Sequence, residues 1–338
     1  ASNFQGLLGN AANFIAYAVM GIPGGILLQR VGYKKTALIA IAIGFVGVLI
    51  QFLSGHSAQN MAFGIYLLGA FVAGFSMCLL NIVVNPMLNT LGGGGNKGNQ
   101  LIQVGGSFNS VMATFTPAFV GILIGEAAKA NIKDVFPVMY IAMGVFAVVF
   151  IVLLAVKIPE PYVSKSKESL KKLMTGALKF RHFVLGAIAI FIYVGVEVGT
   201  PYVMLYWLSD NPEVGKTIAG FVAGTYWFLM LIGRLVGASI GGKVSSKTML
   251  GTASFVGMIL ILLAIFSSTD TMVSLPVLQR SAAGALSFGL AQVPINAMYI
   301  VLVGLCTSIM WGGIFNLAVE GLGKYTAAAS GIFMTLVV

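Results

Sequence analysis

The sequence predicts an all-α membrane protein, a bundle of transmembrane helices, and three observations support this. Of the 338 residues, 58% are hydrophobic and only 8% are charged, whereas about 25% of the residues of a soluble domain are charged. The mean hydropathy is +0.98. Long apolar stretches recur along the chain and lack the alternation of transmembrane β-strands. A soluble globular enzyme is excluded, because such a fold needs more polar surface than this composition supplies.

Apolar segments of the length that crosses a bilayer recur ten times. A hydrocarbon core about 30 Å thick requires about 20 apolar residues per helical crossing. The predicted segments are 4–28, 36–54, 61–91, 100–125, 135–157, 182–208, 217–240, 248–267 and 297–320, with a tenth from Thr326. Residues 268–296 are expected to form an extended outer loop with a short interfacial helix. Residues 169–180 are expected to form a basic amphipathic helix on the inner membrane surface.

Basic residues are distributed unequally between the two faces of this bundle. If each segment reverses direction, 15 of the 19 Lys and Arg residues fall on one face and four on the other. The four are Lys129, Lys133, Lys216 and Arg280, and the rich face includes Lys165, Lys167 and Arg234. The positive-inside rule makes the rich face cytoplasmic. We therefore expect a multi-pass protein of the bacterial inner (plasma) membrane, whose net charge of +10 reflects topology and contact with anionic lipids, with no nucleic acid partner.

The two halves of the chain repeat. GGILLQRVGYKK (24–35) and GASIGGKVSSK (237–247) each join two helices at the predicted cytoplasmic face, and pairing Arg30 with Lys243 gives an offset of 213 residues (243 − 30). With this offset, the helix at 182–208 has its counterpart before residue 1. The expected organisation is an N-terminal half at 1–158 (helices 2–6, helix 1 missing), a cytoplasmic linker at 159–181 and a C-terminal half at 182–338 (helices 7–11, helix 12 missing).

Several short motifs carry a family resemblance. The loop after the first segment matches the loop signature of the major facilitator superfamily at Gly25, Arg30, Gly32, Lys34 and Lys35. Asn85-Pro86, SFNS (107–110) and YVGVEVG (193–199) resemble the fucose-galactose-glucose proton symporter family. The resemblance covers essentially the whole chain. It implies a bundle of two six-helix halves, here about ten helices, that imports a monosaccharide of the fucose, galactose or glucose class by cation (proton) symport with alternating access.

Two departures from the family pattern bear on this resemblance. Gln29 stands where the loop signature has Asp. Asn81 stands four residues before the Asn-Pro pair, where the family has a glutamate implicated in proton coupling, and the family's other coupling acid belongs to helix 1. The resemblance therefore supports sugar transport better than proton coupling.

Amides and aromatic rings within the predicted helices fit a sugar site. Sugar hydroxyls both donate and accept hydrogen bonds, and sugar rings have apolar faces, so amides and aromatic planes are suitable partners. The candidate substrate-binding residues are Asn81, Gln103, Asn109, Tyr193, Glu197, Trp311 and Asn316. For each of them the alternative is a structural contact between helices. Glu197 is also the coupling candidate, because it is the one acid near the middle of a predicted helix.

Enzymatic chemistry is not expected. The sequence offers no nucleophile with a base, no metal-binding cluster and no nucleotide fingerprint, and Cys78 and Cys306 lie within predicted helices. We expect no cofactor and no metal. The expected partners are a monosaccharide, a proton or other cation and the lipid bilayer, and the protein is expected to be a monomer. Two alternatives stay open, a drug or metabolite exporter of the same superfamily and a non-transporting membrane sugar sensor.

Overall fold

The computed structural model describes residues 3–124, 132–158, 160, 170–280 and 286–337. Lys129, Lys165 and Lys167, and most of the linker before residue 170, lie outside the described residues. In the described chain, seven helical stretches are long and apolar enough to cross a membrane. The predicted class, an all-α membrane protein, is confirmed, with the addition of one small β-hairpin.

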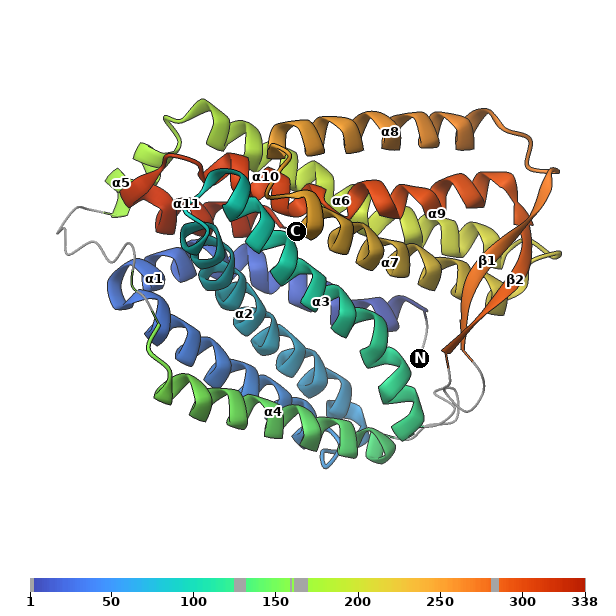
Figure 1. Cartoon of the computed structure of the whole chain (residues 1–338). Helices are drawn as coiled ribbons and strands as arrows, with labels where there is room; N and C mark the ends of the chain where they lie inside the picture. Colours follow the sequence, from blue (N-terminus) through green and yellow to red (C-terminus); the bar gives the residue numbers. More distant parts are fainter. Residues whose placement is uncertain (1–2, 125–131, 159, 161–169, 281–285, 338) are drawn as a thin grey trace. The chain divides into compact units, whose positions relative to one another are not determined.

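The elements follow one another along the chain as helices, with the hairpin inserted late (Figure 1). They are α1 (Asn3–Ser54), α2 (Gln59–Leu91), α3 (Gly95–Ile124), η1 (Ile132–Val135), α4 (Phe136–Ala155), α5 (Leu170–Ala177), α6 (Arg181–Ser209), α7 (Gly215–Ile240), α8 (Ser246–Phe266), β1 (Met272–Arg280), β2 (Leu286–Pro294), α9 (Ile295–Thr307), α10 (Met310–Val319), η2 (Gly323–Tyr325) and α11 (Thr326–Thr335).

The first two predicted segments form one interrupted helix, so the expected loop at 24–35 needs correction. Within α1 only Gly32 departs from helical geometry, with φ 85° and ψ 177°. Glycine lacks the Cβ that makes positive φ costly for other residues, so a single glycine is enough to change the direction of the chain. The predicted junction is therefore a one-residue break.

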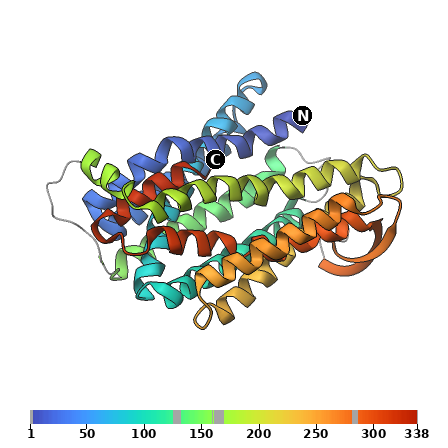
Figure 2. The same ribbon diagram turned by 90° about the horizontal axis from the view of Figure 1, so that it is seen from above.

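Most of the described residues between 268 and 296 form two paired strands and not the expected loop with an interfacial helix. Strands β1 and β2 pair antiparallel, with Val277 opposite Gly289 and Val273 opposite Val293. Leu275 and Val277 are buried while Ser274 and Pro276 are exposed, which is the alternation of a strand with one covered face. The covered face packs on α7 and α9, and Figures 1 and 2 place the hairpin at one end of these helices.

Of two further segments, one is interrupted and one is present as predicted. The predicted helix 297–320 is broken between α9 and α10 at residues 308–309. The amphipathic helix predicted at 169–180 is present as α5. Its Leu173 and Ala177 are fully buried, and Gly176 lies against the ring of Tyr325. Its position on the membrane surface stays a prediction.

Contacts divide the chain into two compact units that do not coincide with the repeat halves. Unit 1 comprises Ala1–Thr90, Ala128–Phe191 and Ala318–Val338, and unit 2 comprises Leu91–Ala127 and Ile192–Leu317. In unit 1, α1 packs on α4 and α11; in unit 2, α7 packs on α3 and α9. Each unit therefore combines helices that the repeat assigns to different halves. The organisation into two halves stays a prediction.

Candidate functional site

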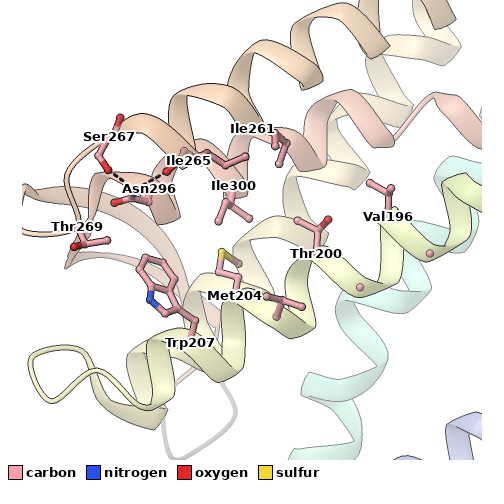
Figure 3. Close-up of a pocket in the computed structure, with 14 residues that line it drawn as sticks. Val196, Thr200, Met204, Trp207, Ile261, Ile265, Ser267, Thr269, Asn296 and Ile300 are labelled. Carbon is pink, nitrogen blue, oxygen red and sulfur yellow. Dashed lines mark hydrogen bonds between the residues drawn. The ribbon is translucent and has the colours of Figure 1, made fainter.

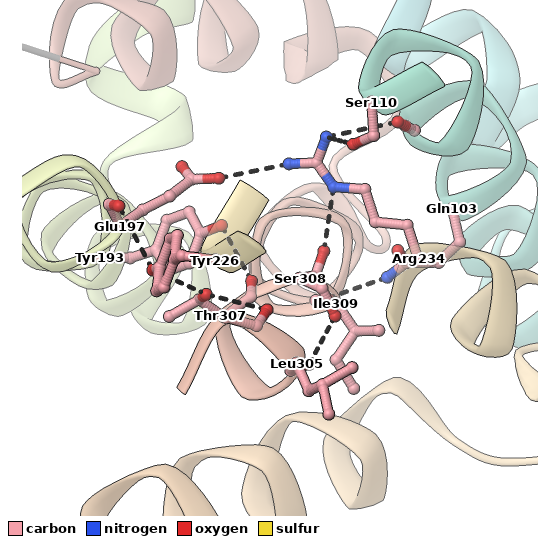
Figure 4. A network of polar contacts seen from close by, with 12 residues as sticks. Gln103, Ser110, Tyr193, Glu197, Tyr226, Arg234, Leu305, Thr307, Ser308 and Ile309 are labelled. Atoms are coloured by element: carbon pink, nitrogen blue, oxygen red, sulfur yellow. Dashed lines mark hydrogen bonds and ion pairs between the residues drawn. The ribbon is translucent and has the colours of Figure 1, made fainter. Parts of the chain in front are cut away.

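A buried ion pair lies inside unit 2. Nη2 of Arg234, on α7, is 3.2 Å from Oε1 of Glu197, on α6, and their side chains are 8% and 14% exposed (Figure 4). A charge within a membrane helix is costly unless it is paired or hydrated. The pair satisfies this requirement for both helices, and it holds the one acidic residue that lies inside an α-helix of the described chain.

Arg234 connects Glu197 to two other elements. Its Nη1 donates to Ser110 Oγ at 2.7 Å and to the Gly106 carbonyl at 3.3 Å, both on α3. Its Nε donates to the Ser308 carbonyl at 3.2 Å, at the break between α9 and α10. A guanidinium has five N–H donors in a fixed plane, so it can join several elements at once. Arg234 thereby links α3, α6 and the α9–α10 break.

Two tyrosines surround this ion pair. The Tyr193 hydroxyl donates to the Thr307 carbonyl at 2.9 Å. The Tyr226 hydroxyl donates to the Glu197 carbonyl at 3.3 Å and lies 3.1 Å from Thr307 Oγ1. Both rings are buried. Tyr193 therefore stabilises the end of α9 in this structure, and its predicted contact with a substrate stays a prediction.

The remaining candidates of unit 2 have different surroundings. Gln103 is buried and its Nε2 donates to the Ile309 carbonyl at 2.9 Å. Asn316 is buried and donates to Ser246 Oγ, at the start of α8, at 2.8 Å. The Trp311 ring meets Phe315 edge-on, with centroids 5.9 Å apart. Asn109 is exposed on α3. The structure thus uses the Gln103 and Asn316 donors for contacts between elements, whereas the Asn109 amide is accessible.

In unit 1, Asn81 belongs to a neutral cluster. Its Nδ2 donates to the Tyr17 hydroxyl at 2.8 Å, and its Oδ1 accepts from Asn85 Nδ2 at 3.2 Å. Asn81 and Asn85 are four residues apart on α2 and therefore share one helix face. In this structure the amide and hydroxyl groups of the cluster bond to one another, and the cluster includes no charge.

The loop motif of the first half lies at the break in α1. The Glu160 carboxylate accepts from the backbone N–H of Tyr33 at 2.6 Å and of Lys34 at 3.0 Å. Lys34 Nζ in turn donates to the carbonyls of Leu154 and Val156, each at 2.8 Å. Helix ends leave such N–H and C=O groups unpaired. Gly32 and Lys34 therefore fasten the start of one helical stretch to the end of α4.

Of the other motif residues, one packs against a neighbouring helix and two are exposed. Gly25 lies against α11, where an added Cβ would be 2.8 Å from the Ala327 carbonyl. Arg30 and Lys35 are exposed. The glycine is thus required for close packing, while these two basic side chains remain at the surface.

A separate pocket of about 650 Å³ lies between α6, α8 and α9 (Figure 3). Its wall is mainly apolar, with Met204, Trp207 and Ile265 among the lining side chains. The Asn296 amide at its edge donates to the carbonyls of Ala264 and Ser267. None of the candidate substrate-binding residues lines it. The pocket therefore lacks the set of amides that a sugar needs.

Sequence reasoning missed Arg234, which it assigned to the cytoplasmic face, and that assignment needs correction. Arg234 lies six residues before the end of α7, which is about 9 Å along the helix axis at 1.5 Å per residue. Sequence reasoning also missed Ser110, which bonds to Arg234, and Tyr226, which bonds to the Glu197 carbonyl. One signal was present, since a lone cation and a lone anion within apolar helices are expected to pair.

Three comparisons place the chain among known proteins. The family model of the Major Facilitator Superfamily matches residues 2–337. A glucose/galactose transporter of Brucella abortus is 29% identical, with 99% of this chain and 76% of the relative covered. The L-fucose-proton symporter of Escherichia coli is 22% identical, with 99% and 76% covered. The crystal structure of the transporter FucP in its outward conformation has a TM-score of 0.79 at 19% identity, covering 99% of this chain and 81% of FucP.

These similarities confirm the predicted family and its fold. The matched proteins are transporters and not enzymes, as expected from the sequence. The family match extends over nearly every residue, including the helices that carry the ion pair. The chain belongs to the major facilitator superfamily.

Proposed function

We propose that this protein is a secondary transporter of the bacterial inner membrane that imports a monosaccharide by alternating access, coupled to a proton or another cation. The names of the relatives support the substrate class, since one is a glucose/galactose transporter and another an L-fucose-proton symporter. The observation that carries the proposal is the Glu197–Arg234 ion pair between two membrane helices.

The ion pair provides a group whose charge can change during a transport cycle. A ligand shifts a conformational equilibrium only by its differential affinity for the two states. A carboxylate that binds a proton in one state and releases it in the other meets this condition. Arg234 also donates to Ser110 on α3. A change of charge at Glu197 therefore acts on an arginine that contacts α3 as well as α6.

The sugar contacts proposed here are led by Asn109 and Asn81. Asn109 is exposed on α3, and an amide on a membrane helix is more stable facing water than facing lipid. Asn81 presents an amide beside Tyr17 and Asn85, a group of donors and acceptors suited to sugar hydroxyls. Trp311 is proposed as a stacking ring. Tyr193, Gln103 and Asn316 are better supported as structural contacts.

Uptake into proteoliposomes tests the proposal. We expect labelled glucose, galactose or fucose to accumulate against its gradient when the outside is acidic. Transport of a drug cation with none of these sugars would favour the exporter alternative. Saturable sugar binding without flux would favour the sensor.

The coupling role of Glu197 has its own test. Glu197→Gln keeps an oxygen that accepts from Arg234 but cannot change its charge. We expect it to abolish concentrative uptake and its pH dependence, while exchange across a preloaded membrane persists, because exchange needs no net proton movement. Glu213→Gln makes the same chemical change in an exposed turn and serves as the control. A Glu197→Gln protein that concentrates sugar with the wild-type pH profile would make Glu197 structural.

A further inference from the structure

Helix α3 is joined to the second-half helices by hydrogen bonds from amide side chains to backbone carbonyls. Gln100 Nε2 donates to the Ala238 carbonyl on α7 at 2.9 Å. Gln103 Nε2 donates to the Ile309 carbonyl at the α9–α10 break, also at 2.9 Å. Both donors are on the first three turns of α3, and all four residues belong to unit 2.

Glycines allow these amides to lie directly against the neighbouring backbone. A Cβ added at Gly242 would be 2.6 Å from Gln100 Oε1, and one added at Gly312 would be 2.7 Å from Gln103 Nε2. A Cβ at Gly241 would be 3.2 Å from the Cα of Gln100. The backbones of the neighbouring segments therefore lie close to α3, and side chains larger than glycine at these positions would collide with the two glutamines.

The position of this contact gives it a consequence for transport. The repeat assigns α3 to the N-terminal half and α7 to the C-terminal half, and the ends that meet here, near Lys97 and Lys243, are those predicted to be cytoplasmic. Two halves that rock about a central site must separate at their inner ends to release substrate inside. The two glutamine bonds must break in that step.

We propose that Gln100 and Gln103 form an inner latch that holds the inward path closed, and that releasing both amides is part of opening toward the cytoplasm. This inference rests on the proposed alternating access. The latch contains no titratable group of its own, since amides donate to carbonyls. Each bond is expected to bias the closed state by about fivefold, the equivalent of a typical neutral hydrogen bond.

Accessibility of an inner cysteine tests the latch. Ser107 lies four residues after Gln103 on the same face of α3 and is buried, so Ser107→Cys reports opening of this contact. Inside-out vesicles are treated with a membrane-impermeant maleimide, in a background where Cys78 and Cys306 are changed to Ser. With Gln100→Met and Gln103→Met together, which keep side-chain length and remove the donors, we expect labelling to rise about 10- to 30-fold.

The same variant predicts a change in transport. In this variant a smaller fraction of molecules faces outward. The half-saturation concentration for external sugar is therefore expected to rise in inverse proportion to that fraction. Met112→Ala, on the exposed face of α3, serves as the control. If the double variant does not fold, the single variant Gln100→Met is used in its place, because Gln100 is less buried than Gln103.

The possible outcomes separate the two proposals. Unchanged labelling in a folded Gln100→Met or double variant that still transports sugar would overturn the latch and leave the proposed function intact. A folded latch variant whose half-saturation concentration for external sugar stays at the wild-type value would also overturn it. A wild-type protein that transports no sugar would overturn the proposed function, while the labelling ratio still reports the latch.

Discussion

The polar clusters that lie within the helices of unit 1 and unit 2 differ in charge. In unit 1, Asn81, Asn85 and Tyr17 form a neutral cluster within the helices. In unit 2, Glu197 and Arg234 form an ion pair that is shared with Ser110. Only the second set contains a carboxylate, a group that can change its charge by binding a proton.

This difference is the basis for a proposed division of tasks between the two units. The family resemblance implicates a helix 4 glutamate in coupling, and Asn81 occupies that position here. An amide keeps the hydrogen-bonding capacity of a carboxylic acid and loses its ability to change charge. We therefore propose that the neutral cluster serves substrate recognition and that the ion pair serves cation coupling, and each can be tested separately.

The largest expected effect comes from breaking the ion pair on one side. Arg234→Met leaves Glu197 without its partner inside the membrane helices, which we expect to destabilise the protein by about 3–5 kcal/mol. Thermal unfolding in detergent measures this loss. Arg234→Met combined with Glu197→Leu removes both charges and is expected to recover most of the stability without recovering concentrative uptake. A double variant as unstable as the single one would show that lost packing, and not the unpaired charge, is the cause.

A smaller and different effect is expected from the neutral cluster. Asn81→Leu removes the donor to Tyr17 and the acceptor for Asn85, so we expect the half-saturation concentration for sugar to rise about 5- to 30-fold, the equivalent of 1–2 kcal/mol. The pH dependence of uptake is expected to stay at the wild-type profile. Asn60→Leu makes the same substitution at the exposed start of α2 and serves as the control. A shift of the pH profile in Asn81→Leu would end the division of tasks.

The sequence was sufficient to predict the helices because the hydropathy signal of each one is averaged over many residues. An apolar stretch of about 20 residues predicts a crossing whatever its neighbours do, and the boundaries of α2, α4 and α6 lie within a few residues of the predicted ones. The sequence predicts a loop in place of the hairpin because the two strands are short and their apolar signal is weak. The alternation around Leu275 and Val277 was available as a signal.

The candidate site was predictable in its residue types and not in their partners. Glu197 and Gln103 are candidates from the sequence, but hydropathy does not show that Glu197 faces Arg234 or that Gln103 donates to Ile309. The positive-inside rule assigned Arg234 to the cytoplasmic face together with the basic loop residues. A cation six residues inside a membrane helix, however, needs a partner. Pairing of distant charges depends on helix packing, which a single sequence does not specify.

The smallest expected effect concerns the charged contacts of unit 1, which lie at helix ends and not within its neutral cluster. Glu160 accepts the N–H groups of Tyr33 and Lys34, the first two residues after the break at Gly32. Glu160→Gln keeps one acceptor oxygen and removes the charge that favours a helix start, so we expect a loss of about 1 kcal/mol, typical of a capping interaction.

Thermal unfolding of Glu160→Gln measures this loss, with Glu213→Gln in an exposed turn of unit 2 as the matched control. Uptake by Glu160→Gln is expected to keep both its half-saturation concentration and its pH profile, because this carboxylate caps a helix end and contacts neither the neutral cluster nor the ion pair. If Glu160→Gln instead flattened the pH profile as Glu197→Gln is expected to do, unit 1 would also contribute a titrating group, and coupling would be shared between the units. An unchanged profile together with the small loss of stability would confine coupling to Glu197 among the carboxylates compared.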